Sequence, residues 1–348
     1  MKENYFCPGP PVLTNRTNMK NPADWDQSDL HRHLQHALDL EIWTIPLYLT
    51  ALYSIKDLPQ NKHQEFPEAA KLIFSVVIQE MLHVEIVANL SNALGYAPRF
   101  KHPVYEESNG IPFIHPPHHL LPDDLKGYEV KPQALNRESL RLFCAIEMPH
   151  IRKEIIWEKE SRYNSIADLY EALKCGVAAL WNTFYVGETN NTKQKNNFKE
   201  YHNRHGKQHG FSIIINSVDT ALAAIEAIVE QGEGADAKRV SADFRPHPIT
   251  DEQVFEAAWF KGNLSHYQKF RILLHSHHKI PPVYHEDMIG DCEAAHHEMM
   301  KAYLSFWNEM EICFNTERNE MSAAFWSSMY SLGNSIAKAW QTGMCPRF

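Results

Sequence analysis

The sequence predicts an all-α protein in which the helices pack as a bundle. Apolar residues recur at steps of three and four along several segments, which start at capping residues or end at glycine and polar loops. The alternation of apolar and polar residues that marks half-buried strands is almost absent. No repeat of fixed period occurs. Helices of this kind bury their apolar stripes against one another, so a bundle is the natural architecture.

The predicted helices are marked by their ends. Ser28 and Asp29 favour a helix start near residue 28, because short polar side chains accept hydrogen bonds from the first turn. Gly95 fits the end of the second helix, and Pro149 predicts a kink in the third. Helices are expected over residues 28–53, 67–94, 136–157, 162–185, 211–231, 250–278, 292–314 and 323–339, and residues 162–185 fit either one helix or two short ones.

Polar stretches separate these helices. Residues 96–134 are rich in Pro, His and Gly, and we expect them to form a long loop folded across the functional site. Residues 187–210 contain many Asn, Lys and His and are predicted to form a second loop. Residues 1–25, rich in Pro and Asn, are expected to be an irregular N-terminal lead.

The bulk composition narrows the choice of partners. The chain has 348 residues and is 44% hydrophobic, which is enough for a sizeable core. Its net charge of −9 argues against nucleic acid or an anionic membrane as the main partner. No apolar run approaches the roughly 18 residues that span a bilayer, and no secretory signal is apparent. Six scattered cysteines without a CxxC pair favour reduced thiols, so we expect a cytoplasmic protein.

Acidic residues interrupt the apolar stripes of three predicted helices. Glu41 lies in the middle of the first stripe, Glu80 and His83 lie one turn apart in the second, and Glu147 lies in the third. A lone carboxylate is costly in a core unless it is paired, protonated or bound to metal. The first stripe consists of Leu30, Leu34, Leu38, Glu41, Ile45, Tyr48 and Leu52.

One metal site shared by these helices would account for all of the acidic positions. Helical bundles hold two metal ions with single glutamates from some helices and Glu-x-x-His pairs from others. Oxygen and imidazole ligands suit iron or manganese. A solitary Glu-x-x-His also occurs on solvated helix faces, so the prediction depends on Glu41 and Glu147 as well as on Glu80 and His83.

Periodicity alone does not decide whether two further groups of residues are metal ligands. Glu226, Glu230 and Glu233 lie beside the apolar stripe of residues 211–231 and fit either a solvated acidic face or a metal ligand. His266 lies within an apolar stripe and fits either a satisfied core histidine or the second histidine of the site.

Five blocks of sequence together resemble a known family. They read HLQHALDLEIWTIPLYLTALYSI, QEMLHVEIVANLSNALGYAP, IEMP, AIVEQGEGA and SHYQKF, and they fall between about residues 30 and 274. They resemble the ferritin-like family that contains iminophenylpyruvate dimer synthase, an enzyme of bis-indole pigment biosynthesis. The family often has an acid where this chain has Gln79. The resemblance implies a ferritin-like four-helix bundle whose metal ligands are Glu41, Glu80, His83, Glu147, Glu230 or Glu233, and His266.

The ligand set and the resemblance favour a metal-dependent oxidase or oxygenase. It would hold two iron ions, with manganese as the other candidate, and act with dioxygen on a small, amino-acid-derived molecule of secondary metabolism. An oxidative coupling enzyme that joins two imines and a metal-binding bundle without catalysis are the alternatives. We expect residues 26–285 to form the metal-binding domain and residues 286–348 a helical extension, whose apolar stripes leave a homo-oligomer open.

Overall fold

The computed structural model describes most of the chain, and its regular elements are helices. The described residues are 20–58, 66–105, 123–148, 163, 165–198, 214–232, 264–276, 280–287, 290–318 and 320–348. Within these ranges, the departures from helix and loop are isolated bridge residues: Ile55 pairs with Val283, and Tyr163 is a further single bridge residue. The all-α prediction is therefore confirmed. The α-helices are α1 Gln27–Tyr53, α2 Glu68–Ala93, α3 Arg137–Ile146, α4 Ile166–Phe184, α5 Val218–Gly232, α8 His266–His275, α9 Cys292–Asn315 and α10 Ala323–Gln341.

Helix α1 begins slightly before its predicted start. Its N-cap is Asp26, whose side chain accepts a hydrogen bond from the backbone N–H of Asp29 at 3.0 Å. The Asp29 carboxylate accepts in return from the backbone N–H of Asp26 at 3.2 Å. This reciprocal capping box satisfies two N–H groups that the first turn leaves unpaired, which is why Asp26 rather than Ser28 or Asp29 caps the helix.

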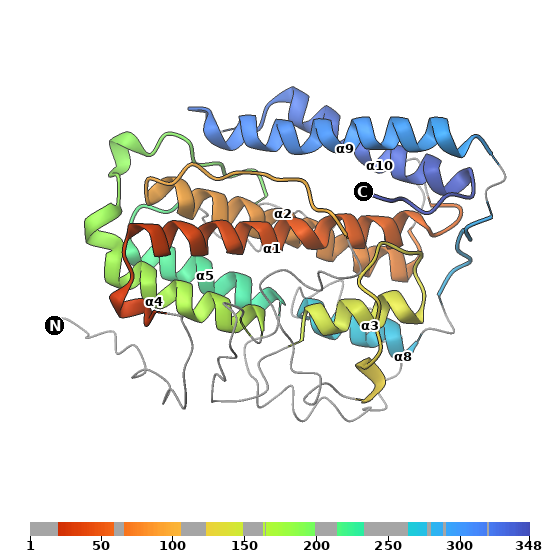
Figure 1. Cartoon of the computed structure of the whole chain (residues 1–348), viewed down its shortest axis with the longest axis horizontal. Coiled ribbons are helices and arrows are strands. Elements are labelled where there is room, and N and C mark those ends of the chain that lie inside the picture. The colour runs from red at the N-terminus through yellow and green to blue at the C-terminus, as the bar shows by residue number, and fades with distance from the viewer. Residues whose placement is uncertain are drawn as a thin grey trace.

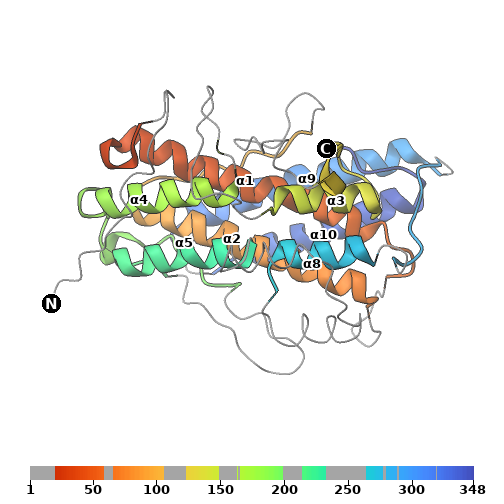
Figure 2. The same ribbon diagram turned by 90° about the horizontal axis from the view of Figure 1, so that it is seen from below.

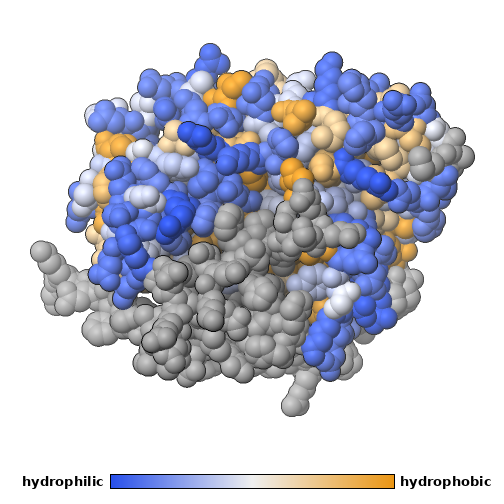
Figure 3. Space-filling model, in the orientation of Figure 1, coloured by the Kyte–Doolittle hydropathy of each residue, from blue (hydrophilic) through white to orange (hydrophobic). Residues whose placement is uncertain are grey.

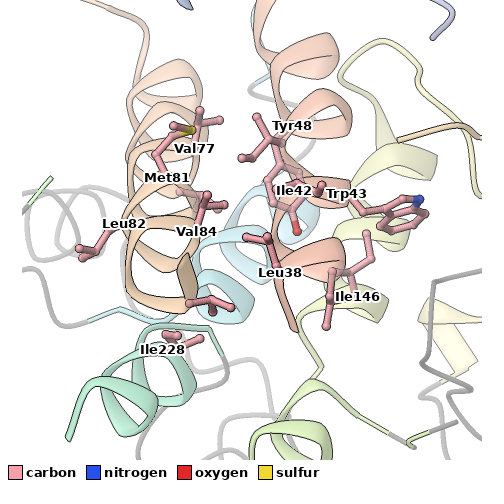
Figure 4. Close-up of a cluster of buried hydrophobic side chains, with 14 of the residues drawn as sticks. Leu38, Ile42, Trp43, Tyr48, Val77, Met81, Leu82, Val84, Ile146 and Ile228 are labelled. Atoms are coloured by element: carbon pink, nitrogen blue, oxygen red, sulfur yellow. The ribbon is translucent and has the colours of Figure 1, made fainter. Parts of the chain in front are cut away.

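Helices α1 and α2 lie side by side and antiparallel at the centre of the molecule (Figure 1). In Figure 4, Leu38 and Ile42 of α1 face Val84 of α2, whereas Trp43 extends from the other side of α1. Leu38, Ile42 and Val84 are buried almost completely. Burial of each such side chain contributes about 1.5–3 kcal/mol, so the pair is held mainly by its apolar contact.

Four shorter helices complete the bundle as two interrupted columns. Helices α3 and α4 follow one another along one column, and α5 and α8 follow one another along the second (Figure 2). Helix α3 packs against α8, and α4 packs against α5. The bundle therefore consists of two long helices and two composite ones, and both composite columns are interrupted near the middle of the molecule.

Helix α3 ends earlier than the sequence predicts. Glu147 is its C-cap, with φ −86° and ψ 12°, and the expected continuation to residue 157 lies largely outside the described residues. Because a proline disfavours the helical region for the residue before it, Pro149 favours an end close to Met148. Helix α8 covers only the last part of the predicted helix 250–278, of which residues 250–263 lie outside the described residues.

The described parts of the two predicted long loops contain no α-helix. Residues 96–105 are irregular, and short 3₁₀ turns occur at Asp123–Leu125 and Glu188–Asn190. The middle of the first loop, residues 106–122, lies outside the described residues. The expectation that this loop crosses the site therefore stays a prediction.

Helices α9 and α10 form an antiparallel layer on the side of α1 and α2 that faces away from α3, α4, α5 and α8 (Figure 1). The indole Nε1–H of Trp340 donates to the carbonyl oxygen of Thr50 at 2.9 Å. The Nδ2 group of Asn92 donates to the carbonyl oxygen of Phe314 at 3.0 Å. The predicted helical extension is thus packed directly on the bundle, while its boundary at residue 285 stays a prediction.

The exposed face in Figure 3 is mostly hydrophilic, with hydrophobic residues in small separate patches. Among the described residues, α2 is long and apolar enough to cross a membrane, but 78% of its most apolar window is buried within the protein. That burial is the pattern of a core helix, because a helix that is apolar on every side needs neighbours on every side.

Candidate metal centre

The structure brings five of the predicted ligands together at the centre of the bundle. Glu41 comes from α1, Glu80 and His83 from α2, Glu147 from the end of α3, and His266 from the first position of α8. None of the five is more than 4% exposed. The cluster lies where the composite columns are interrupted, because α3 ends at it and α8 begins at it.

The carboxylate of Glu80 stands between two halves of the cluster. Its Oε2 atom lies 3.8 Å from Nδ1 of His83, and that nitrogen lies 3.2 Å from Oε2 of Glu41. Its Oε1 atom lies 2.9 Å from Nδ1 of His266, and that nitrogen lies 3.5 Å from Oε2 of Glu147. Each half therefore contains one histidine, one outer glutamate and one oxygen of Glu80.

Hydroxyl groups hold the three carboxylates in place. The hydroxyl of Tyr170 donates to Oε1 of Glu41, and the hydroxyl of Tyr48 donates to Oε1 of Glu147 at 2.5 Å. The Thr44 hydroxyl lies 3.2 Å from Oε2 of Glu80 and donates to it. Each outer glutamate thus gives one oxygen to a tyrosine and leaves the other facing a histidine.

His83 is oriented by a residue of α5. Its Nε2 atom lies 3.1 Å from Oε1 of Gln231, and an amide oxygen can only accept. Nε2 therefore carries the proton of the neutral ring, and the lone pair of Nδ1 faces the carboxylates of Glu41 and Glu80. A lone pair directed at carboxylate oxygens is repulsive unless a proton or a cation lies between them.

His266 is buried without hydrogen bonds. The residue is 0% exposed, and within the described residues neither Nδ1 nor Nε2 makes a hydrogen bond of acceptable geometry. Unpaired buried polar atoms are rare in folded proteins because each one costs about 1–3 kcal/mol. The ligand atoms of Glu80, His83 and His266 lie within 4.8 Å of one another, which is a spacing that one ion could bridge.

Burial and mutual repulsion shift the pKa values in the cluster. Burial raises the pKa of Glu80 well above its usual value, and the charges of Glu147 and Glu41 raise it further. Burial also raises the pKa of Glu41, but His83 in its protonated form lowers it more, through its charge and its hydrogen bond, so the net shift is downward. A cation bound among these groups would favour their charged forms and displace the proton from Glu80.

A buried lysine lies beside the cluster. Lys269 lies one turn after His266 on α8, is 4% exposed, and donates from Nζ to Oε1 of Gln79. Burial lowers the pKa of Lys269 to about 7, although the charges of Glu147 and Glu80 oppose the shift. Gln79, which directly precedes Glu80, therefore accepts a hydrogen bond from a buried lysine.

The acids of α5 are placed only in part. The side chain of Glu226 is 59% exposed and lies 3.6 Å from Lys174, so it belongs to the solvated face. The backbone of Glu230 lies within α5, while its side chain and the whole of Glu233 lie outside the described residues. The end of α5 does reach the cluster, because a Cβ at Gly232 would lie 3.5 Å from Oε2 of Glu147. The ligand role of Glu230 and Glu233 stays a prediction.

Three residues that contact the cluster are not predicted from the sequence. Tyr48 lies on the same stripe as Glu41 and reads as apolar, although its hydroxyl bonds Glu147. Tyr170 and Gln231 come from helices whose registers relative to the cluster are set by tertiary packing. A tyrosine in line with a buried glutamate is the one signal that could have indicated this role for Tyr48.

The donor set fits metal ions. Three carboxylates and two imidazoles are the oxygen and nitrogen ligands that iron and manganese take in helical bundles. The unpaired Nδ1 atom of His266 and the lone pair of His83 both face the carboxylates of this cluster. Bound cations would satisfy each of these groups at once.

The fold and the cluster together define a helical bundle with an internal carboxylate–histidine site. The ferritin-like family model matches residues 34–275, which include all five clustered residues. The chain therefore belongs to the ferritin-like family, and the predicted ferritin-like fold is confirmed.

A solved structure supports the same assignment over a longer range. The chain is similar to a ferritin-like protein from Caulobacter vibrioides, with 26% sequence identity and a TM-score of 0.67. The match covers 93% of this chain and 99% of the other, so it extends into the C-terminal helices beyond the family match. A comparison with curated proteins found no match.

Proposed function

We propose that this protein is a metal-dependent oxidoreductase, with two iron ions as the favoured centre, that uses dioxygen to oxidise a small, amino-acid-derived metabolite. The observation that carries the proposal is the division of the Glu80 carboxylate between two similar halves. One half offers His83 and Glu41, and the other offers His266 and Glu147. Two such halves sharing one carboxylate suit two ions better than one.

The residues that would hold the ions are Glu41, Glu80, His83, Glu147 and His266, with Glu230 or Glu233 as a further acid. Bound iron would supply the electrons and the Lewis acidity that dioxygen chemistry needs. The chain itself orients the ligands, since Tyr48 and Tyr170 fix the outer glutamates and Gln231 fixes the ring of His83. Burial of the whole cluster excludes bulk water and strengthens these interactions.

The substrate class is proposed from two observations. The sequence blocks around the cluster resemble the family of an enzyme that acts on amino-acid-derived imines. Lys269 places a buried amine beside the cluster, and its protonated form can pair with the carboxylate of an amino-acid derivative. We therefore favour substrates with one carboxylate and an oxidisable amine or imine.

Metal loading followed by oxygen consumption tests the proposal. The purified protein is loaded anaerobically with ferrous iron, the iron bound per chain is measured, and oxygen uptake is followed with a set of amino acids and their imines. We expect about two ions per chain and uptake that depends on both iron and substrate. Glu80→Ala should lose iron while keeping its helix content, and Glu226→Ala, which alters a solvated acid, should keep both. Full activity without metal would overturn the proposal.

The same experiment separates the alternatives. An oxidative coupling enzyme like iminophenylpyruvate dimer synthase would give a product of twice the substrate mass, which mass spectrometry detects. A metal-binding bundle without catalysis would retain its iron and show no substrate-dependent oxygen uptake with any member of the set.

A further inference from the structure

A cavity lies on the side of the α1–α2 pair that is opposite the carboxylate cluster. It has a volume of about 310 Å³, is partly open to solvent, and is lined mainly by residues of this pair and of helix α10. Leu49 of α1, Met81 of α2 and Trp326 of α10 are among its lining residues. The helices that line it are therefore the central pair and the C-terminal layer. The composite columns that carry Glu147 and His266 do not contribute to its lining.

Helical geometry separates the cavity from the cluster. On α2, Val77 and Met81 line the cavity and lie four residues apart on one face. Glu80 and His83 lie on a different face of the same helix, because each residue turns the helix by about 100°. The cavity is thus a separate site, although it shares helices with the cluster.

The lining has the chemistry of a pocket for an apolar ring system. No charged side chain is found among the described residues that line it, and rings from Phe74, Phe198 and Trp326 contribute. Met81 and Met329 add flexible sulfur-containing side chains that pack well against aromatic rings. An apolar cavity of about 150 Å³ holds a benzene molecule, so a volume twice as large suits two fused rings.

Two tyrosines belong to this lining: Tyr330 is 69% exposed, so its hydroxyl is solvated, whereas Tyr53 is half-buried. Tyr53 lines the cavity, and among the described residues no hydrogen-bond partner of its hydroxyl is found. The hydroxyl lies against Gly333, where an added Cβ would come within 2.4 Å of Oη of Tyr53. Glycine at this position therefore leaves room for the hydroxyl. Asn197 also lines the cavity, but its amide is engaged with Glu85 and with the backbone of Met321.

We propose that this cavity binds a neutral molecule of two fused aromatic rings that carries one hydrogen-bonding group, which pairs with the hydroxyl of Tyr53. The rings fill the space between α2 and α10, and the single polar group of the ligand pairs with the less exposed of the two tyrosine hydroxyls in the lining. A charged ligand is disfavoured, because the lining offers no counter-ion and burial of an unpaired charge is costly.

Binding of 2-naphthol to the full-length protein tests this proposal, with naphthalene as the matched probe that lacks the hydroxyl. We expect one 2-naphthol per chain, in metal-free and iron-loaded protein alike, so the result does not depend on the proposed reaction. Tyr53→Phe should weaken 2-naphthol binding about fivefold, the loss of one hydrogen bond, and leave naphthalene binding unchanged.

Two variants that fill the cavity provide the decisive comparison. Met329→Trp and Ile78→Trp each add volume to a half-buried lining residue, and either one should weaken 2-naphthol binding at least tenfold. Met300→Trp, a half-buried methionine of α9 outside the lining, is the matched control and should bind like the parent. Helix content and melting temperature identify any variant that fails to fold. Absence of binding to the parent, or equal binding by a folded cavity-filling variant, would overturn the proposal.

Discussion

The Oε1 atom of Glu80 lies 2.9 Å from Nδ1 of His266, in a region where neither residue is more than 2% exposed. The two residues come from α2 and α8, which are far apart in the sequence, with α3, α4 and α5 between them. His266 makes no hydrogen bond to any of the described residues, so its position beside a carboxylate needs a cation or a proton to be favourable.

The two tyrosines that hold the outer glutamates should control metal affinity. Tyr48→Phe removes the hydroxyl bound to Glu147, and Tyr170→Phe removes the one bound to Glu41. We expect each change to lower metal affinity roughly 10–100-fold, because an unsupported ligand loses its orientation. Competition with a chelator measures the affinity. Tyr330→Phe, at a residue that is 69% exposed, is the control, and affinities equal to its value would contradict this role.

The contact between Gln231 and His83 should act through ring orientation. Gln231→Leu removes the acceptor for Nε2–H of His83, and we expect metal affinity to fall by roughly 10–100-fold. Gln231→Glu keeps an oxygen acceptor and should retain most of the affinity. Equal loss in both variants would show that the contact serves packing and does not orient the ring.

Gly176 should be intolerant of a side chain. A Cβ added there would lie 2.1 Å from Cε3 of Trp25, a buried ring that also stacks on His33. We expect Gly176→Ala to lower the free energy of unfolding by about 1–3 kcal/mol, because the tryptophan must move. Denaturant unfolding measures the change, with Ala179→Ser on the exposed face of α4 as the control. An unchanged free energy would mean that Trp25 is packed elsewhere.

His33 should make the protein less stable in acid. Its Nδ1–H donates to the carbonyl oxygen of Asp29 at 2.7 Å, so Nε2 accepts from the Tyr163 hydroxyl at 2.7 Å. Burial lowers the pKa of His33 to about 4 from 6.5. Between these two values the unfolded chain binds a proton that the folded protein does not, so stability falls as pH falls from 6.5 to 4. The full effect is about 3 kcal/mol.

A comparison of unfolding free energies across this pH range tests the effect. His33→Gln cannot titrate, so its stability should fall less steeply between pH 6.5 and pH 4 than that of the parent. Parallel curves for the two proteins would assign the acid sensitivity to other groups.

The sequence predicts the helices and part of the cluster for identifiable reasons. Glu41, Glu80 and His83 lie on long, regular stripes, so periodicity alone assigns them to the interior. Glu147 caps a helix that ends sooner than its pattern suggests. Gln231 and Tyr170 depend on how α5 and α4 dock against the central pair, and periodicity within one helix carries no information about that docking.

The division of the site into two halves also requires the folded structure. The pattern places Glu80 in the interior, but only the folded arrangement directs one of its oxygens toward His83 and the other toward His266. The direction of each carboxylate oxygen depends on side-chain packing across four helices, which sequence spacing does not encode.

Anomalous X-ray scattering from crystals of the iron-loaded protein, recorded at the iron absorption edge, is the most direct test of this centre. We predict two peaks on either side of the Glu80 carboxylate, one beside His83 and Glu41 and one beside His266 and Glu147. A single peak bound outside this cluster, or no peak in protein that has been loaded with iron, would contradict the two-metal centre.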